Sequence, residues 1–307
     1  MTATITRPAR VEASAPPRIP LRYRIPWKKI MLYLLALGFA AFFIAPFYWI
    51  VATSFMHEAD AVSVPPQWIP QHPTLDNYLS FLDPSRAEFA SRAVENLPRA
   101  MANSAIVATL TALCNLLLGV LAAYTFARIP FRGSKVLLMV YLATRMVPGV
   151  TIIVPFYLLM RALHLLDTYL ALILSYTTFA LPFTIWILKD YFRTIPRELE
   201  DAARVDRCTW PQMMRQVFLP IATPGLVTVT IFSFLSAWNE FMFALFLTST
   251  IETQTMPIIV ANFATDINVQ YTVMAAAGVL AVIPPLVIVM AFQRLIVRGL
   301  AAGSVKG

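Results

Sequence analysis

Four residues in or beside long apolar stretches could contact a polar solute: Arg145, Trp238, Asn239 and Glu240. An ionisable side chain at membrane depth is costly unless it meets a partner, water or a ligand. The run from Trp238 to Glu240 joins a ring that can stack on a sugar to groups that can hydrogen-bond to it. These residues are therefore candidate pathway residues. An ion pair or hydrogen bond that only holds helices together is the open alternative.

Catalytic, metal and nucleotide motifs are missing from the sequence. The histidines His57, His72 and His164 are too scattered to suggest a metal site. No H-E-x-x-H or G-x-S-x-G pattern occurs, and the nine glycines include no G-x-x-x-x-G-K-[ST] phosphate loop. We expect no catalytic residue, no bound metal and no cofactor in this chain.

A polar segment from Thr194 to Pro220 is patterned as two short helices. Pro196 suits a first helical turn, and acids favour the positive end of the helix that follows: Glu198, Glu200 and Asp201. Thr209 and Gln212 form a capping box at the start of a second helix, which Pro220 is expected to end.

The second helix carries an apolar stripe at helical spacing, formed by Trp210, Met213, Met214 and Val217. Such a stripe needs a partner, which is the bilayer surface, the rest of this chain or another protein. Helical spacing alone leaves all three open.

The composition predicts an all-α, polytopic membrane protein, because 59% of the residues are hydrophobic and only 13% are charged. Apolar runs long enough to cross a bilayer as helices predict six spans. The expected spans are Ile30–Ser54, Met101–Phe126, Val136–Met160, Thr168–Leu188, Ile221–Thr248 and Thr272–Phe292.

The Lys and Arg residues gather at the two ends of the chain and in the even-numbered connections, which predicts that both termini are cytoplasmic. Phe55 to Ala100 and Ser249 to Tyr271 are then the main external loops. This topology explains the net charge of +8 better than nucleic-acid binding does. We expect a disordered basic tail at 1–29, a first helix with its external loop at 30–100, a core at 101–293 and a C-terminal tail at 294–307.

The segment also resembles the EAA loop of binding-protein-dependent ABC importer permeases, which reads Glu-Ala-Ala, three residues, Gly, nine residues, then Ile-x-Leu-Pro. Asp201 stands at the Glu position beside Glu200, and Arg207 replaces the Gly that would ease the turn. The remaining positions agree: Ala202, Ala203, Val217, Leu219 and Pro220.

The resemblance covers nearly the whole chain after the basic tail and is closest to the sugar-importing branch with the smaller, MalG-like maltose permease subunit. The supporting stretches are Pro65–Tyr78, Asn103–Gly133, Trp238–Phe241 and Gln293–Gly307. It implies an ABC importer type I permease core in the inner membrane, whose path carries a sugar or related polyol.

The implied partners are a second homologous permease, two copies of a cytoplasmic ABC ATPase that binds ATP and Mg, and an extracytoplasmic solute-binding protein. By resemblance, the short helices act as coupling helices that dock in a groove of the ATPase. The small Ala202 and Ala203 would allow close approach there, and the stripe from Trp210 to Val217 would add apolar contact. A secondary transporter of small polar solutes is the main alternative, and it would have no need for this patterned loop. A membrane-embedded enzyme is a third, and it would need a nucleophile and base or a metal constellation inside the spans.

Overall fold

The computed structural model describes residues 27–86, 92–264 and 269–304, and it describes side chains as far as residue 295. Within these ranges the chain forms helices, turns and loops and no strand, as the predicted all-α class requires. It divides into two units, residues 1–47 and residues 48–307. The predicted tail at 1–29 lies almost wholly outside the described residues.

Helix α1 (Trp27–Thr53) starts in the first unit and is long and apolar enough to cross a membrane. None of its residues up to Phe47 is buried within this chain. The predicted first span is therefore confirmed as a helix.

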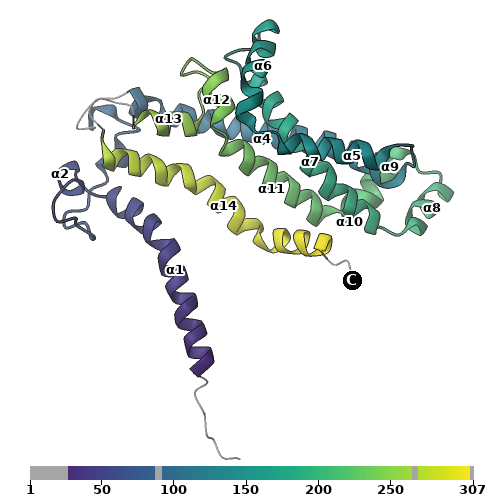
Figure 1. The fold of residues 1–307 in the computed structure, drawn as a ribbon, viewed down its shortest axis with the longest axis horizontal. Coiled ribbons are helices and arrows are strands. Elements are labelled where there is room, and N and C mark those ends of the chain that lie inside the picture. Colours follow the sequence, from purple (N-terminus) through teal and green to yellow (C-terminus); the bar gives the residue numbers. More distant parts are fainter. Residues whose placement is uncertain (1–26, 87–91, 265–268, 305–307) are drawn as a thin grey trace, which may run out of the picture. The chain divides into compact units, whose positions relative to one another are not determined.

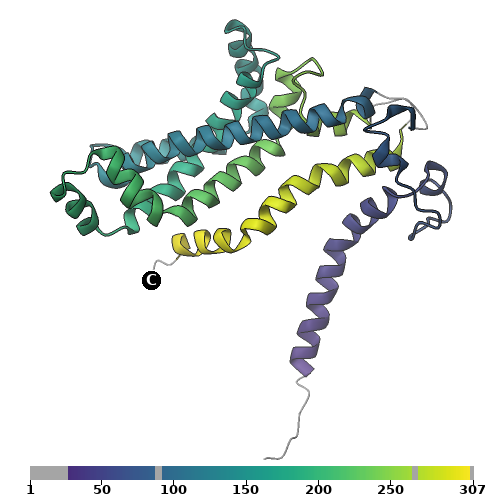
Figure 2. The same ribbon diagram turned by 180° about the vertical axis from the view of Figure 1, so that it is seen from behind.

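Three further helices of the second unit confirm predicted spans: α4 (Arg92–Arg128), α7 (Tyr169–Thr194) and α14 (Tyr271–Ser304). Helix α4 packs along α7 and α11 (Thr223–Trp238), and α11 also packs on α14 (Figures 1 and 2). Gly119 allows the close approach of α4 to α7, since a Cβ there would lie 2.4 Å from Cγ2 of Thr184.

The third predicted span, Val136–Met160, is wrong as a continuous helix. Helix α5 (Ser134–Ala143) passes through the short η2 (Thr144–Met146) and turns by 98° into α6 (Gly149–Ala162). Pro148 has no N–H to continue a helix, and it disfavours helical backbone at Val147, which is extended at φ −75° and ψ 122°.

The fifth predicted span, Ile221–Thr248, is also interrupted. Helix α11 has 16 residues, which is about 24 Å of helix against a hydrocarbon core of about 30 Å. After the break at Asn239 and Glu240 the chain resumes as α12 (Met242–Leu247). Within the described residues, four helices could span a membrane alone. Up to six spans result if the bent pairs Ser134–Met146 with Gly149–Ala162 and Trp210–Ile221 with Thr223–Trp238 each count as one.

The two predicted short helices are present between α7 and α11. The first is α8 (Arg197–Val205), and the second starts at α9 (Trp210–Met213) behind the predicted capping box of Thr209 and Gln212. The second does not end at Pro220, because it continues through the π-helical η3 (Met214–Phe218) and α10 (Leu219–Ile221). It then bends by 83° into α11.

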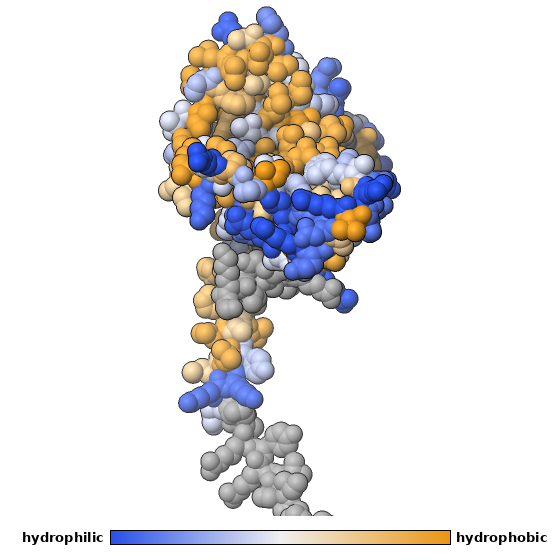
Figure 3. All heavy atoms as spheres, turned by 90° about the vertical axis from the view of Figure 1, so that its right-hand side faces the viewer, coloured by the Kyte–Doolittle hydropathy of each residue, from blue (hydrophilic) through white to orange (hydrophobic). Residues whose placement is uncertain are grey.

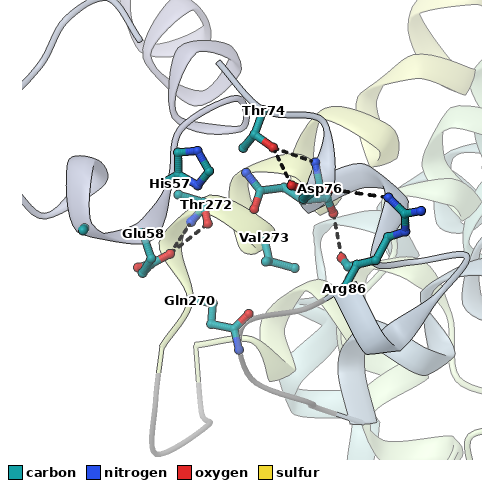
Figure 4. Close-up of a pocket in the computed structure, with 11 residues that line it drawn as sticks. His57, Glu58, Thr74, Asp76, Arg86, Gln270, Thr272 and Val273 are labelled. Atoms are coloured by element: carbon teal, nitrogen blue, oxygen red, sulfur yellow. Dashed lines mark hydrogen bonds and ion pairs between the residues drawn. The ribbon is translucent and has the colours of Figure 1, made fainter. Parts of the chain in front are cut away.

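The predicted external loops contain short helices: α2 (Glu58–Ala61), α3 (Asp76–Leu79), η1 (Pro84–Arg86) and α13 (Met256–Asn262). The carboxylate of Glu58 accepts hydrogen bonds from the backbone N–H groups of Tyr271 (2.9 Å) and Thr272 (3.1 Å), at the start of α14 (Figure 4). Glu58 and Thr272 line a pocket, and on its other side Oδ1 of Asp76 lies 3.6 Å from Nη1 of Arg86 (Figure 4). The Glu58 contacts attach the first loop to the start of α14, and the Asp76–Arg86 pair links two parts of the loop itself.

Candidate functional site

Helix α8 has one face against the protein and one face in solvent. Glu200 and Ala203 are buried, at 6% exposure each. Leu199 and Val205 are apolar residues left 42% and 80% exposed, and Asp201 and Ala202 are exposed beside them. The two alanines of the motif therefore face opposite ways: Ala203 contacts this chain, and Ala202 is free to contact another.

Glu200 is held by a network of charged and hydroxyl groups. Its Oε2 lies 3.6 Å from Nε of Arg128, and both side chains are under a tenth exposed. Its Oε1 accepts hydrogen bonds from Nη2 of Arg204 at 2.7 Å and from the hydroxyl of Tyr124 at 3.3 Å. Glu200 thus ties α8 to the end of α4, whereas Asp201 at the motif's acidic position is exposed. In the sequence, Arg128 is simply one of the cations of an even-numbered connection that predict the topology.

The apolar stripe of the second helix packs mainly on this chain. Met213 and Met214 are 5% and 4% exposed, and they join a core cluster with residues of α4, α7 and α11. Val217 is half-buried against the same cluster. Only Trp210 stays 42% exposed, with its ring edge against Tyr124. Of the three partners that the spacing left open, the chain's own helices cover most of the stripe.

Arg207 makes the turn that a glycine makes in the resembling motif. Its φ is +55°, in the left-handed region, which costs an ordinary residue about 1 kcal/mol or more. The turn is closed by hydrogen bonds from Arg207 N to Arg204 O (3.0 Å) and from Cys208 N to Ala203 O (2.9 Å). The glycine-like backbone geometry is therefore kept despite the substitution.

The end of the second unit that carries α8 combines hydrophilic and apolar surface. Seen from that side, hydrophilic side chains gather in a patch beside broad apolar surface (Figure 3). The exposed polar residues of α8 and the turn after it are Arg197, Glu198, Asp201, Arg204, Asp206 and Arg207. Both charge signs are present, so this surface suits a partner with mixed charges.

The structure places Arg145 in the break between α5 and α6. Its guanidinium lies 5.5 Å from the ring centroid of Phe183, and it lines a cavity of about 200 Å³ with Ser233 and Ser236 of α11. No ion pair of Arg145 occurs among the residues that the structure describes. The non-helical Val147 beside it is exposed. Irregular backbone at membrane depth requires protein or water around it.

Residues Trp238, Asn239 and Glu240 form the second break. Trp238 is 2% exposed, and its Nε1–H donates to Ala281 O of α14 at 3.1 Å. Glu240 caps α12, accepting from Phe243 N at 2.9 Å and Ala244 N at 3.1 Å. Asn239 is exposed, and it lines a cavity of about 560 Å³. Trp238 and Glu240 hold the break together, and Asn239 is the member of the three that is open to a solute.

Asp167 was missed from the sequence. It lies between α6 and α7, and its Oδ1 accepts hydrogen bonds from the backbone N–H groups of Ser249 and Thr250, at 3.1 Å each, and from the Thr253 hydroxyl. Partial burial would raise its pKa, but the Thr253 hydroxyl and the loop amides outweigh that effect and lower the pKa to about 2. The backbone of Asp167 has a positive φ of 61°, a conformation that aspartate tolerates better than most residues. This feature is visible in the structure and not in the sequence.

Metal-ligating side chains do not gather in the described part of the chain: no group of three or more His, Cys, Asp or Glu residues could hold an ion there.

Comparison with known proteins gives consistent matches along the chain. A sulfoquinovosyl glycerol transport system permease of Agrobacterium fabrum is 36% identical over 263 residues, which are 85% of this chain and 88% of that protein. A trehalose transport system permease of Mycobacterium tuberculosis is 39% identical over 241 residues, 78% of this chain and 84% of that protein.

The fold has a solved counterpart in a bacterial ABC transporter involved in the import of alginate. One of its chains superposes with a TM-score of 0.74 at 22% identity, covering 90% of this chain and 99% of that chain. Residues 115–302 match the family described as binding-protein-dependent transport system inner membrane component, and this region includes α8 to α12 and both helix breaks. Because the match covers more than half of the chain, the protein belongs to the binding-protein-dependent transport system inner membrane components.

Proposed function

We propose that this chain is a permease subunit of an ATP-driven importer that takes up a sugar or a related polyol. The observation that carries the proposal is the two-faced α8, with Glu200 and Ala203 bound to the chain's own helices while Leu199, Asp201, Ala202 and Val205 stay exposed. Exposed apolar side chains beside the charges of Glu198, Asp201 and Arg204 suit a protein partner, which can offer both apolar contact and opposite charge.

The partner at α8 is a cytoplasmic ABC ATPase, present in two copies and binding ATP and Mg, which this chain has no phosphate loop to bind. The chain itself is not an enzyme. Both termini are cytoplasmic, because the segment from Lys189 to Arg215 is rich in cations that favour that side. Glu200 and Ala203 act from within the loop, and its outer residues make the docking contact, together with the exposed ring of Trp210.

The translocation path runs past the two helix breaks and is completed by a second, homologous permease. Arg145 is exposed within this chain at a break, and its charge favours water or a protein partner over lipid. Asn239 is exposed at the other break. Arg145, Trp238, Asn239 and Glu240 therefore remain the proposed pathway residues, with Trp238 and Glu240 shaping the path and Asn239 and Arg145 facing it.

The cargo class follows from the relatives, whose names specify sulfoquinovosyl glycerol, trehalose, and trehalose or maltose. Each is a sugar or a glycoside, so we infer that an extracytoplasmic binding protein delivers a solute of this class. We assign residues 101–293 to the permease core, with a basic tail at 1–29, the first helix and external loop at 30–100 and a C-terminal tail at 294–307.

Co-expression tests this assignment. The tagged chain, produced together with a second permease and an ABC ATPase of the same transport system, should retain both through purification in detergent. Retention of the second permease without the ATPase, both with and without nucleotide, would contradict the docking role of α8.

A further inference from the structure

Arg128, the last residue of α4, contacts three parts of the segment between α7 and α11. Its Nε lies 3.6 Å from Oε2 of Glu200 in α8. Its Nη2 donates a hydrogen bond to the carbonyl of Ile195, in the turn between α7 and α8. Its Cζ lies 5.2 Å from the ring centroid of Phe218 in η3. The turn, α8 and the second helix therefore share one anchor.

This anchor is charged and buried, since the side chains of Arg128 and Glu200 are 5% and 8% exposed. If the two separate, the buried Arg128 loses its carboxylate partner while Glu200 keeps Arg204 at 2.7 Å, so the cost of an unpaired Arg128 charge opposes separation. The coupling segment and the end of α4 consequently move together when the segment is displaced.

The other half of α4 holds the loop between α12 and α13. The Nδ2 of Asn103 donates to the carbonyls of Glu252 (3.0 Å) and Gln254 (2.8 Å). The Oγ of Ser104 accepts from the N–H of Met256 at 2.8 Å. Asn103 is itself fixed by the hydroxyl of Tyr169 at 2.6 Å. Backbone carbonyls of this loop are thus bound directly to a side chain of α4.

The two anchors lie on one uninterrupted helix, since α4 runs from Arg92 to Arg128. From Asn103 to Arg128 the helix is about 38 Å long at about 1.5 Å per residue. A single rigid element joins the two contact sets, which is the kind of physical connection that coupling between distant sites requires.

We propose that α4 carries movement of the coupling segment to the external loop 249–255, with the Arg128–Glu200 pair as its input contact and Asn103 as its output contact. The proposal rests on the proposed function, in which an ATPase moves α8. Arg128, Glu200 and Asn103 are positioning residues here: they transmit displacement and touch neither nucleotide nor solute.

The test uses the whole complex in proteoliposomes, with Cys114 and Cys208 replaced by serine and a fluorophore on Thr250→Cys in the external loop. Glu200→Gln and Arg128→Lys weaken the input contact, and Asn103→Ala removes the output contact. Glu95→Gln is the charge control, because it makes the same charge change at an exposed residue outside the coupling segment. Asn96→Ala is the control on α4, because the described hydrogen bond of the Asn96 amide goes to Arg92 O of its own helix.

Three quantities are measured: ATP hydrolysis, the number of solutes imported per ATP, and the nucleotide-dependent change in fluorescence. We expect Glu200→Gln and Asn103→Ala to keep the ATPase bound and hydrolysing, while solutes per ATP fall by about fivefold or more and the fluorescence change is lost. Arg128→Lys should give a partial loss, because lysine keeps the charge without the second contact to Ile195. The two controls should match the unaltered complex.

Unchanged solutes per ATP and an unchanged fluorescence response in Glu200→Gln and Asn103→Ala would overturn the proposal. If Glu200→Gln fails to assemble, Arg128→Lys and Asn103→Ala decide by the same two readouts. The proposal would also be overturned if the unaltered complex transported solute while the fluorescence of its external loop did not change with nucleotide. Absence of ATP-dependent uptake by the unaltered complex would instead count against the proposed function.

Discussion

Ala202 and Ala203 are neighbours of equal size, but Ala202 is exposed and Ala203 is buried. Replacing each by aspartate therefore distinguishes effects on docking of the ATPase from effects on folding of the coupling segment. Ala203 is 6% exposed and lies in the cluster that includes Met213, Met214 and Phe218. A carboxylate there would be buried among apolar side chains, and an uncompensated buried charge costs about 3 to 5 kcal/mol. Ala203→Asp should therefore loosen the whole coupling segment.

Ala202→Asp should leave the segment folded, because Ala202 is exposed. If Ala202 enters a desolvated contact with the ATPase, the added charge weakens assembly by about 1 to 3 kcal/mol, which is about 5-fold to 150-fold. Limited proteolysis of the isolated chain in detergent reports on loosening, and ATPase retention reports on docking. We expect rapid cleavage near Arg204 and Arg207 only in Ala203→Asp, and loss of the ATPase in both variants.

Two results would refute this reasoning. Ala203→Asp with the wild-type cleavage rate would show that its side chain is not packed as the structure has it. Ala202→Asp with undiminished ATPase retention would show that the outer face of α8 is not the docking face. Ala202→Ser, which adds one hydroxyl and no charge, is the matched control and should behave as wild type in both assays.

The remaining predictions concern the breaks, the external loop and helix packing. Trp238→Phe should lose the 3.1 Å bond to Ala281 O, lowering thermal stability by about 1 kcal/mol while uptake continues; abolished uptake in a stable variant would make Trp238 a solute contact instead. Asp167→Asn should increase hydrogen exchange of the Ser249 and Thr250 amides, and unchanged protection would contradict the clamp. Because the pKa of Asp167 falls from 3.8 to about 2, its contribution to stability is complete above about pH 4 and is lost as the pH falls toward 2. Between pH 5 and 8, the pH dependence of exchange at the Ser249 and Thr250 amides should therefore be the same in the wild type and in Asp167→Asn. A pH-dependent change in that range that occurs only in the wild type would contradict the lowered pKa of Asp167. Gly119→Val should lower thermal stability through a clash with Thr184, whereas Gly38→Val, where a Cβ meets nothing within 4 Å, should not.

Composition and periodicity predicted the helical class and the four continuous spans because apolar length alone decides which segments suit a bilayer. The EAA-type spacing likewise located both short helices, and the capping box of Thr209 and Gln212 formed as expected. These features depend on local sequence, so a single chain suffices to read them.

The breaks could not be predicted because proline gives an ambiguous signal inside membrane helices. Pro155 and Pro182 lie within continuous helices, whereas Pro148 stands at a 98° bend. The difference depends on which neighbours satisfy the freed backbone groups. Glu240 shows the same point: the sequence marked it as a costly charge, and only the structure reveals the α12 amides that it caps.

The directions of side chains on α8 were also beyond the sequence. Glu200 and Asp201 are neighbours with the same charge, and the motif treats them as one acidic feature. Glu200 is buried because Arg128, 72 positions earlier in the chain, lies at its side. A pairing over that separation leaves no trace in local spacing.

ATP-dependent uptake in proteoliposomes tests the central claim most directly. The account predicts that the purified chain alone accumulates no labelled sugar. The complex with the second permease, the ATPase and the loaded binding protein should accumulate it only when ATP is present on the ATPase side. Accumulation by the single chain without ATP would contradict the account.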